Sequence, residues 1–267
     1  MKPVGVVLAG LLWAATAVAG NLELSGAIEQ GGMMIGRVPA GSEVRLDGET
    51  LRVSPDGVFV AGFDRDADPE ANLAVVLPDG GVEHRTLSVT QRDYQIQRID
   101  GLPPSQVTPD EEALKRIRRE QALIDRARAI DAPRTDFLAG FVRPVDGARI
   151  SGVFGSQRIL NGEPRRPHYG VDYAAPAGTP VKAPAPGTVT LVHGDMFFSG
   201  GTIILDHGHG ISSVFIHLSR IDVREGDRIA RGDVIGAVGA TGRATGPHLH
   251  WGMNWFGTRL DPQLLLD

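Results

Sequence analysis

The sequence predicts a mainly β protein, and three observations favour that fold class. The 267 residues include 35 glycines and 18 prolines, which is typical of a chain with many turns. Short runs of β-type residues alternate with turn signals over two long stretches, and only one segment has a convincing helical pattern. We therefore expect a C-terminal antiparallel β-sheet domain, preceded by a small β-sandwich-like domain and a connecting α-helix.

The first residues have the pattern of a secretory signal peptide, which we place at residues 1–19. Lys2 supplies a positive start, the run from Val4 to Val18 is almost entirely apolar, and Ala17-Val18-Ala19 has a small-x-small cleavage pattern. A single membrane anchor is the alternative, but this run is shorter than the ~20 apolar residues that span a bilayer. We therefore predict an exported protein with no membrane span after signal cleavage.

Residues 20–103 have the pattern of a small β domain. The dipeptide Asp47-Gly48 separates two β-type runs, which is a strong hairpin signal. Further runs are punctuated by turn residues in the same way; they are Val58-Phe59-Val60, Ala74-Val75-Val76-Leu77 and Thr86-Leu87-Ser88-Val89. His84 is the one histidine of this region, and we expect it on the surface. Nothing in this domain indicates chemistry.

Residues 104–133 contain the predicted helix. Thr108 is a suitable N-cap, Pro109 suits the first helical position, and Glu111 would complete a capping box. A narrow apolar stripe contains Leu114, Ile117 and Ile124, and the rest of the segment is dense in charge. We expect a connector packed along one of the β domains. The alternative is an arm that docks a partner or blocks a site.

Residues 134–267 return to the β pattern, and the segments 181–192 and 229–238 are predicted to pair. The formal net charge of −5 gives no indication of nucleic-acid binding. The chain has no cysteine, which excludes disulfides, thiolate zinc sites and a cysteine nucleophile. The histidines carry more information, because all except His84 lie from His168 onward.

One strand near the C-terminus has a face that resembles a site. If residues 247–255 are extended, alternate side chains point to opposite faces. His248 and His250 then share a face with Gly252 and Asn254, while Leu249, Trp251, Met253 and Trp255 form a core face. The two imidazoles lie ~6.6 Å apart along such a strand, so one could bind an ion while the other flanks it.

A second pair, His168 and Asp172, is four residues apart. In a straight strand these residues would be ~13 Å apart and could not share an ion. Gly170 permits a bend or bulge between them that would bring the two side chains together.

A third histidine, His217, lies in a predicted strand. Alternation puts Val214, Ile216 and Leu218 on a core face and His217 on the opposite face with Phe215 and Ser213. We expect His193, His207 and His209 to be structural, since polar residues near turns commonly satisfy backbone groups.

Two imidazoles and one carboxylate form a common ligand set of catalytic zinc, with one position open for water. Zinc makes hydroxide available near neutral pH, and two further histidines could move protons and stabilise the oxyanion. Spacing alone does not decide whether His248 or His250 is the ligand.

The motifs together resemble the exported zinc endopeptidases of the lysostaphin and LytM-like family, peptidase family M23, from about Val142 to Pro262. The matching residues occur in order: Phe154-Gly155, His168 with Asp172, Gly178-Thr179-Pro180-Val181, Gly187-Thr188-Val189, Asp206-His207-Gly208, His217-Leu218, Gly226-Asp227, Gly239-Ala240-Thr241-Gly242, and His248 with His250. The family often has Thr and Tyr where this chain has Ser213 and Phe215, so a tyrosine hydroxyl is not available here.

The resemblance implies a function and assigns the site residues. His168, Asp172 and His250 match the family's ligands for one Zn²⁺ per chain, and His217 and His248 match its two non-ligand catalytic histidines. The implied activity is hydrolysis of peptide cross-links in bacterial peptidoglycan by zinc-activated water, in the periplasm or cell envelope. Stem peptides and cross-bridges are the expected partners, and protein regulators are possible.

Three expectations remain open at this stage. Asn161, in the insertion 156–166, is a possible substrate contact. The alternative function is a catalytically silent module that binds the wall and activates another hydrolase. The N-terminal β domain and the charged helix could position the cleft or restrict access to it.

Overall fold

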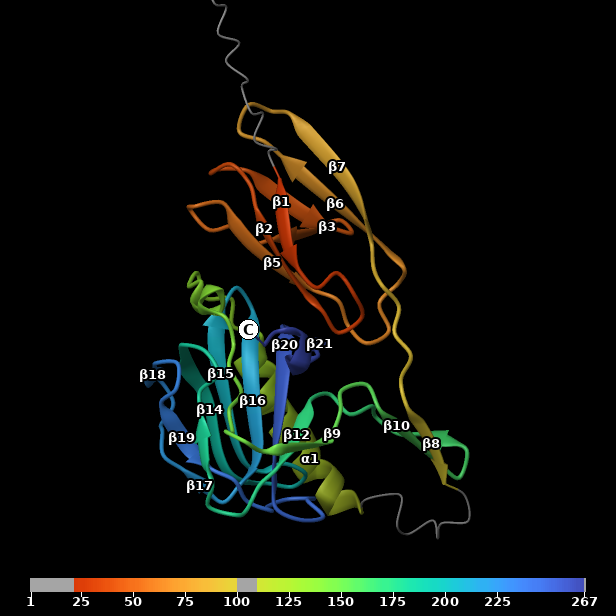
Figure 1. Ribbon diagram of the computed structural model, residues 1–267, viewed down its shortest axis with the longest axis vertical. Helices are drawn as coiled ribbons and strands as arrows, with labels where there is room; N and C mark the ends of the chain where they lie inside the picture. Colours follow the sequence, from red (N-terminus) through yellow and green to blue (C-terminus); the bar gives the residue numbers. More distant parts are fainter. Residues whose placement is uncertain (1–21, 100–109, 267) are drawn as a thin grey trace, which may run out of the picture.

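The computed structural model describes residues 22–99 and 110–266, and Figure 1 shows their arrangement. The predicted signal peptide, and Thr108 and Pro109 of the predicted helix start, lie outside the described residues. The mainly β fold class is confirmed, because strands make up most of the regular structure and the described residues contain one α-helix. None of the described residues forms a helix with the length and apolar character that crossing a membrane requires.

The N-terminal β region consists of two small antiparallel sheets that enclose their own core. One sheet has the order β1-β2-β5 and the other β4-β3-β6-β7. Their strands are β1 (Glu23–Gly26), β2 (Met33–Arg37), β3 (Glu43–Leu46), β4 (Glu49–Leu51), β5 (Val58–Gly62), β6 (Glu70–Val76) and β7 (Val82–Ser88). The predicted hairpin is confirmed: Asp47 and Gly48 both have positive φ, 48° and 87°, as a tight hairpin turn requires. His84 is exposed on β7.

The C-terminal region is built on an eight-stranded antiparallel sheet, hereafter the central sheet. Its order is β18-β14-β15-β16-β20-β12-β9, and β21 pairs with β20. These strands are β9 (Arg149–Gly152), β12 (Val171–Ala174), β14 (Gly187–Met196), β15 (Gly200–Gly208), β16 (Ile211–Leu218), β18 (Arg228–Ile229), β20 (His248–Trp255) and β21 (Thr258–Leu260). The predicted pairing of 181–192 with 229–238 is confirmed in two parts, because β14 pairs with β18 and β13 with β19.

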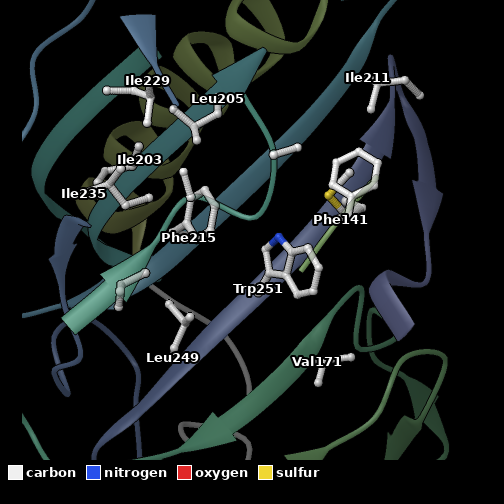
Figure 2. Close-up of a cluster of buried hydrophobic side chains, with 14 of the residues drawn as sticks. Phe141, Val171, Ile203, Leu205, Ile211, Phe215, Ile229, Ile235, Leu249 and Trp251 are labelled. Atoms are coloured by element: carbon white, nitrogen blue, oxygen red, sulfur yellow. The ribbon is translucent and has the colours of Figure 1, made fainter. Parts of the chain in front are cut away.

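One face of the central sheet, hereafter the core face, packs against a small three-stranded sheet. That sheet has the order β13-β19-β17, with β13 (Pro180–Lys182), β17 (Arg220–Ile221) and β19 (Val234–Ala237). Figure 2 shows the resulting core, in which Phe215, Leu249 and Trp251 lie together with Ile203 and Ile235. Short 3₁₀ helices η2 (Asp136–Ala139) and η3 (Pro262–Leu264) flank this region.

The opposite face of the central sheet, hereafter the site face, is partly covered by helix α1 (Glu111–Arg128). Ala127 packs there against Ile204, Val214 and neighbouring apolar side chains. The predicted N-cap was wrong: Asp110 caps the helix, and its Oδ1 accepts a hydrogen bond from the Ala113 N–H at 2.8 Å. Acidic residues in the first turn and arginines in the last complement the helix dipole.

The two regions contact one another directly. Val58 and Val60 of β5 belong to the same buried cluster as Trp251, and Trp255 packs against both cores. Arg92 forms an ion pair with Asp261 at 2.8 Å across this contact. A further small sheet, β11-β10-β8, contains β8 (Ile96–Ile99), β10 (Gln157–Leu160) and β11 (Glu163–Pro164).

Candidate metal centre

Strand β20 carries two histidines on the site face. Leu249, Trp251 and Met253 are completely buried on the core face, as the alternating pattern predicts. His248 and His250 point the other way and remain partly exposed. Burial of the apolar side chains therefore determines which way the two imidazoles face.

Three donor atoms from distant parts of the chain converge beside this strand. The Nε2 atom of His168 lies 3.0 Å from Asp172 Oδ1 and 2.9 Å from His250 Nδ1, and the last two atoms are 2.9 Å apart. Such a cluster suits ligands that each lie ~2 Å from a common ion. Two imidazoles and one carboxylate form the donor set of catalytic zinc sites, so these residues fit a zinc ion.

Glycines make room for this convergence. Asp172 on β12 pairs directly with His250 on β20, whereas His168 lies in the bend before β12. A Cβ on Gly170 would lie only 2.5 Å from the Trp251 carbonyl oxygen and 2.7 Å from His250 Nε2. A Cβ on Gly152 would be 2.3 Å from Asp172 Oδ2. The predicted convergence across Gly170 is confirmed, and Gly152 is a contributor that the sequence did not single out.

Backbone carbonyls fix the orientation of three of the histidine rings. His168 Nδ1 donates to the Val153 oxygen at 2.9 Å, His248 Nδ1 to Gly246 at 2.9 Å, and His217 Nδ1 to Thr241 at 2.8 Å. Because a carbonyl oxygen only accepts, each Nδ1 carries the proton and each neutral ring keeps a lone pair on Nε2. Such outer contacts orient metal ligands and catalytic imidazoles.

The prediction for the faces of β16 was wrong. Phe215 is completely buried on the core face opposite Trp251, while Val214 and Ile216 lie on the site face. His217 adopts a left-handed backbone with φ of 66°, which breaks the alternation. Leu218 therefore returns to the core face, and His217 turns toward the site beside His248, with ring centroids 4.8 Å apart.

The arrangement shifts the pKa values of the site groups. Although burial opposes ionisation of Asp172, hydrogen bonds from His168 and His250 hold the pKa of its carboxyl well below the usual value. Burial opposes protonation of His168, but the hydrogen bond to Asp172, the charge of Asp172 and the Val153 contact together outweigh it and raise the pKa of His168. Burial lowers the pKa of His217 to about 4, helped by the nearby His248 and His250. His217 is therefore neutral at pH 7.

His193, His207 and His209 are not among the converging donors. His207 is completely buried between the Pro186 carbonyl oxygen, 2.6 Å from its Nδ1, and Ser213 Oγ, 2.8 Å from its Nε2. His209 is buried beside Phe137, and His193 lies on β14, where its Nδ1 accepts the Asp195 N–H.

Two residues differ from the sequence-based expectation. Asn161 was expected to contact substrate, whereas no role was expected for Thr241. Asn161 lies in the turn between β10 and β11 with φ of 52°, followed by Gly162 at 81°, and β10 pairs with β8. The structure does not bring it to the histidine cluster. Thr241 was not predicted as a functional residue, yet its carbonyl oxygen accepts from His217. The sequence feature that could have identified Thr241 is its position within the Gly239–Gly242 motif.

The central sheet with its two-histidine, one-aspartate cluster defines a β protein with a candidate metal-dependent site. Comparisons with known proteins agree. Residues 166–262 match the model of peptidase family M23. The DD-carboxypeptidase/endopeptidase Mpg of Neisseria meningitidis is 40% identical over 121 residues, which cover 45% of this chain and 28% of that protein. The peptidoglycan DD-endopeptidase ShyA of Vibrio cholerae is 40% identical over 110 residues, 40% of this chain and 25% of that protein.

A solved structure described as a peptidase M23 from Pseudomonas aeruginosa extends the match over most of the molecule. It is 34% identical with a TM-score of 0.69, and the match covers 89% of this chain and 94% of that one. The chain belongs to peptidase family M23, so the resemblance stated from its motifs is confirmed. The aligned segments span only about a quarter of the length of the Neisseria and Vibrio relatives.

Proposed function

We propose that this protein is an exported zinc-dependent endopeptidase that hydrolyses peptide cross-links of bacterial peptidoglycan. The observation that carries the proposal is the convergence of His168, Asp172 and His250 at 2.9–3.0 Å on the site face of the central sheet. Relatives named as peptidoglycan DD-endopeptidases, which share 37–40% identity with this chain, support the choice of substrate. The signal-peptide pattern at residues 1–19 supports export.

The zinc ion would be held by His168, Asp172 and His250. When bound, it would act as a Lewis acid and activate water at neutral pH. Their geometry needs little rearrangement, because the strand pairing of Asp172 with His250 and the Val153 contact of His168 already orient the donors. Asp172 contributes a negative charge, since its pKa lies far below neutrality.

His217 and His248 would handle protons and the developing oxyanion. Their rings lie side by side, and His248 Nε2 is 4.0 Å from Asp172 Oδ1, so both imidazoles border the ligand cluster. With each Nδ1 donating to a backbone carbonyl, Nε2 is the atom left to accept a proton from water or to donate one to the substrate oxygen or leaving amine. Each such role is worth roughly 10²–10⁴-fold in rate.

The domain organisation is part of the proposal. Residues 134–267 would form the peptidase domain, residues 20–103 a small β domain, and residues 104–133 the connecting helix. The contacts of Val58, Val60 and Arg92 with the C-terminal region support a β domain that is fixed beside the peptidase domain rather than freely tethered.

The test is product analysis after digestion of purified sacculi by the secreted chain. We expect mass spectrometry to show loss of cross-linked dimeric muropeptides and gain of monomers, with cleavage abolished by a chelator and restored by zinc. The His250→Ala variant should lose activity, whereas His193→Ala, a histidine on β14 outside the cluster, should retain it. A zinc-loaded protein that leaves dimers intact, but stimulates another wall hydrolase, would instead establish the silent activator.

A further inference from the structure

A polar cavity is lined in part by the segment that follows His168. Its volume is about 280 Å³. The residues that matter for its chemistry come from three places: Asp64, Arg65 and Asp66 from the N-terminal β region, Arg166 and Tyr169 from the segment before β12, and Arg259 from β21. Tyr169, which lines the cavity, directly follows His168 in the chain.

The N-terminal side of the cavity contains two carboxylates, Asp64 and Asp66, and one guanidinium, Arg65, so its net charge is −1. Arg65 Nη1 forms an ion pair with Asp66 Oδ1 at 2.6 Å, and Arg65 Nε donates to the Gly155 oxygen at 2.8 Å. Asp64 Oδ1 accepts the Asp66 N–H at 2.8 Å. This side of the cavity therefore does not attract an anion, and any attraction must come from the opposite side.

The other side carries positive charge without a matching carboxylate. Among residues 22–99 and 110–266, no carboxylate lies within ion-pairing distance of Arg166 or Arg259. Arg259 Nη1 donates to the neutral Asn254 amide oxygen at 2.7 Å, and its guanidinium lies over the Tyr169 ring. Arg166 is exposed. An anion in the cavity would therefore contact the guanidinium groups of Arg166 and Arg259 on one side.

A third arginine reinforces this charge. Arg128, in the last turn of α1, has a buried Nε atom without a hydrogen-bond partner in the described structure. Burial, together with the charges of Arg259 and Arg166, lowers the pKa of Arg128, and burial and Arg166 lower that of Arg259. Asp125 on the same helix offsets this repulsion in part. Because these guanidinium groups repel one another, the binding of an anion between them is favoured.

The distance along β20 between the cavity and the metal centre can be compared with the length of a bound peptide. Asn254, the partner of Arg259, lies four residues beyond His250 on the same face of β20, which corresponds to ~13 Å along a strand. An extended peptide rises ~3.3 Å per residue. A group held by Arg166 and Arg259 would therefore be about three or four residues from a peptide bond at the metal centre.

We propose that Arg166 and Arg259 form a carboxylate subsite, which binds a free carboxylate of the peptide substrate a few residues from the scissile bond. The planar guanidinium fork suits a carboxylate, because two parallel N–H groups can donate to its two oxygens. The inference rests on the proposed peptidase function and adds a specificity element to it. Substrates in which that carboxylate is amidated would bind less well.

The test compares two synthetic cross-linked peptides that differ only by a carboxylate or a carboxamide at this position. We expect the wild-type chain to have a KM for the carboxylate peptide about tenfold lower, with similar kcat, as a charge-assisted contact predicts. Arg166→Gln and Arg259→Gln should each reduce this preference, and Arg166→Lys should restore part of it. The matched control is Arg85→Gln, which removes an exposed arginine of β7.

The results distinguish failure of the carboxylate subsite from failure of the proposed peptidase function. Equal KM values for the two peptides with the wild-type chain, or a preference that survives both Gln variants, would overturn the subsite. If the wild-type chain cleaves neither peptide, the proposed function fails, and calorimetric titration of both peptides into the wild-type and Arg166→Gln chains still decides the subsite. Because Arg166 is exposed, its substitution tests recognition with little risk to folding.

Discussion

Asp172 and His250 are directly opposite each other on neighbouring antiparallel strands, with Oδ1 and Nδ1 2.9 Å apart. The strands that carry them are held in register by Tyr173 and Trp251, whose side chains are completely buried on the core face. A slip of one residue would move one member of the pair to the other face. The same packing that stabilises the central sheet therefore also sets the spacing of the metal-ligand candidates.

The Gly170→Ala substitution tests how tightly this spacing is fixed. The new Cβ would lie 2.7 Å from His250 Nε2 and 2.5 Å from the Trp251 carbonyl oxygen, so the histidine ring or the backbone must move. We expect zinc affinity to fall by about tenfold or more, because displacement of orienting contacts typically costs that much. Calorimetric zinc titration measures this. Gly194→Ala is the control, since a Cβ there meets nothing within 4 Å. Equal zinc affinities for the two variants would contradict the packing account.

The His217→Asn substitution separates backbone conformation from imidazole chemistry. Asparagine tolerates the left-handed backbone found at residue 217, so the fold of β16 should be preserved. Because His217 is not among the converging donors, we expect normal zinc content but a kcat reduced by roughly 10²–10⁴-fold. Steady-state kinetics and elemental analysis of the same preparation provide the measurement. Loss of zinc, or full activity, would be inconsistent with the proposed role.

The buried His207 makes the fold sensitive to acid. Burial lowers its pKa from the usual 6.5 to about 4, so the folded state favours the neutral ring. The corresponding stability is complete above pH 6.5 and is lost as the pH falls toward 4, where the unfolded chain binds the extra proton first. That shift corresponds to about 3 kcal/mol of unfolding free energy.

Urea unfolding at pH 7 and pH 4.5, with a chelator present so that metal release does not contribute, measures this effect. The His207→Asn variant should be less stable at pH 7, because it loses the contact with Ser213. It should also lose less stability on acidification than the wild-type chain. An unchanged pH dependence in the variant would show that other groups cause the acid sensitivity.

Patterns with a regular period were predictable from the sequence. The two faces of β20 follow from strict alternation, and the Asp47-Gly48 hairpin follows from residues that tolerate positive φ. The convergence of His168 and Asp172 was predictable because Gly170 marks a bend. Only the resemblance to a known family separated His250 from His248.

Local departures from the period were not predictable. His217 reaches the site face through one left-handed residue, and histidine adopts that conformation too rarely for the sequence to predict it at this position. The helix start was misplaced by two residues because Thr108 and Asp110 are both good N-cap residues, and Asp110 makes the hydrogen bond. The arginine cluster of Arg128, Arg166 and Arg259 depends on long-range contacts between three separate segments.

Zinc titration of the chelator-stripped chain, with hydrolysis of a cross-linked muropeptide dimer as the readout, tests the central claim most directly. We predict that the rate rises in proportion to added zinc and reaches a plateau at about one equivalent per chain, as a single three-ligand site requires. The His250→Ala variant should bind little zinc and remain inactive at the same zinc concentrations. A rate that does not depend on zinc, or a His250→Ala chain that binds zinc and cleaves the dimer like wild type, would contradict the account.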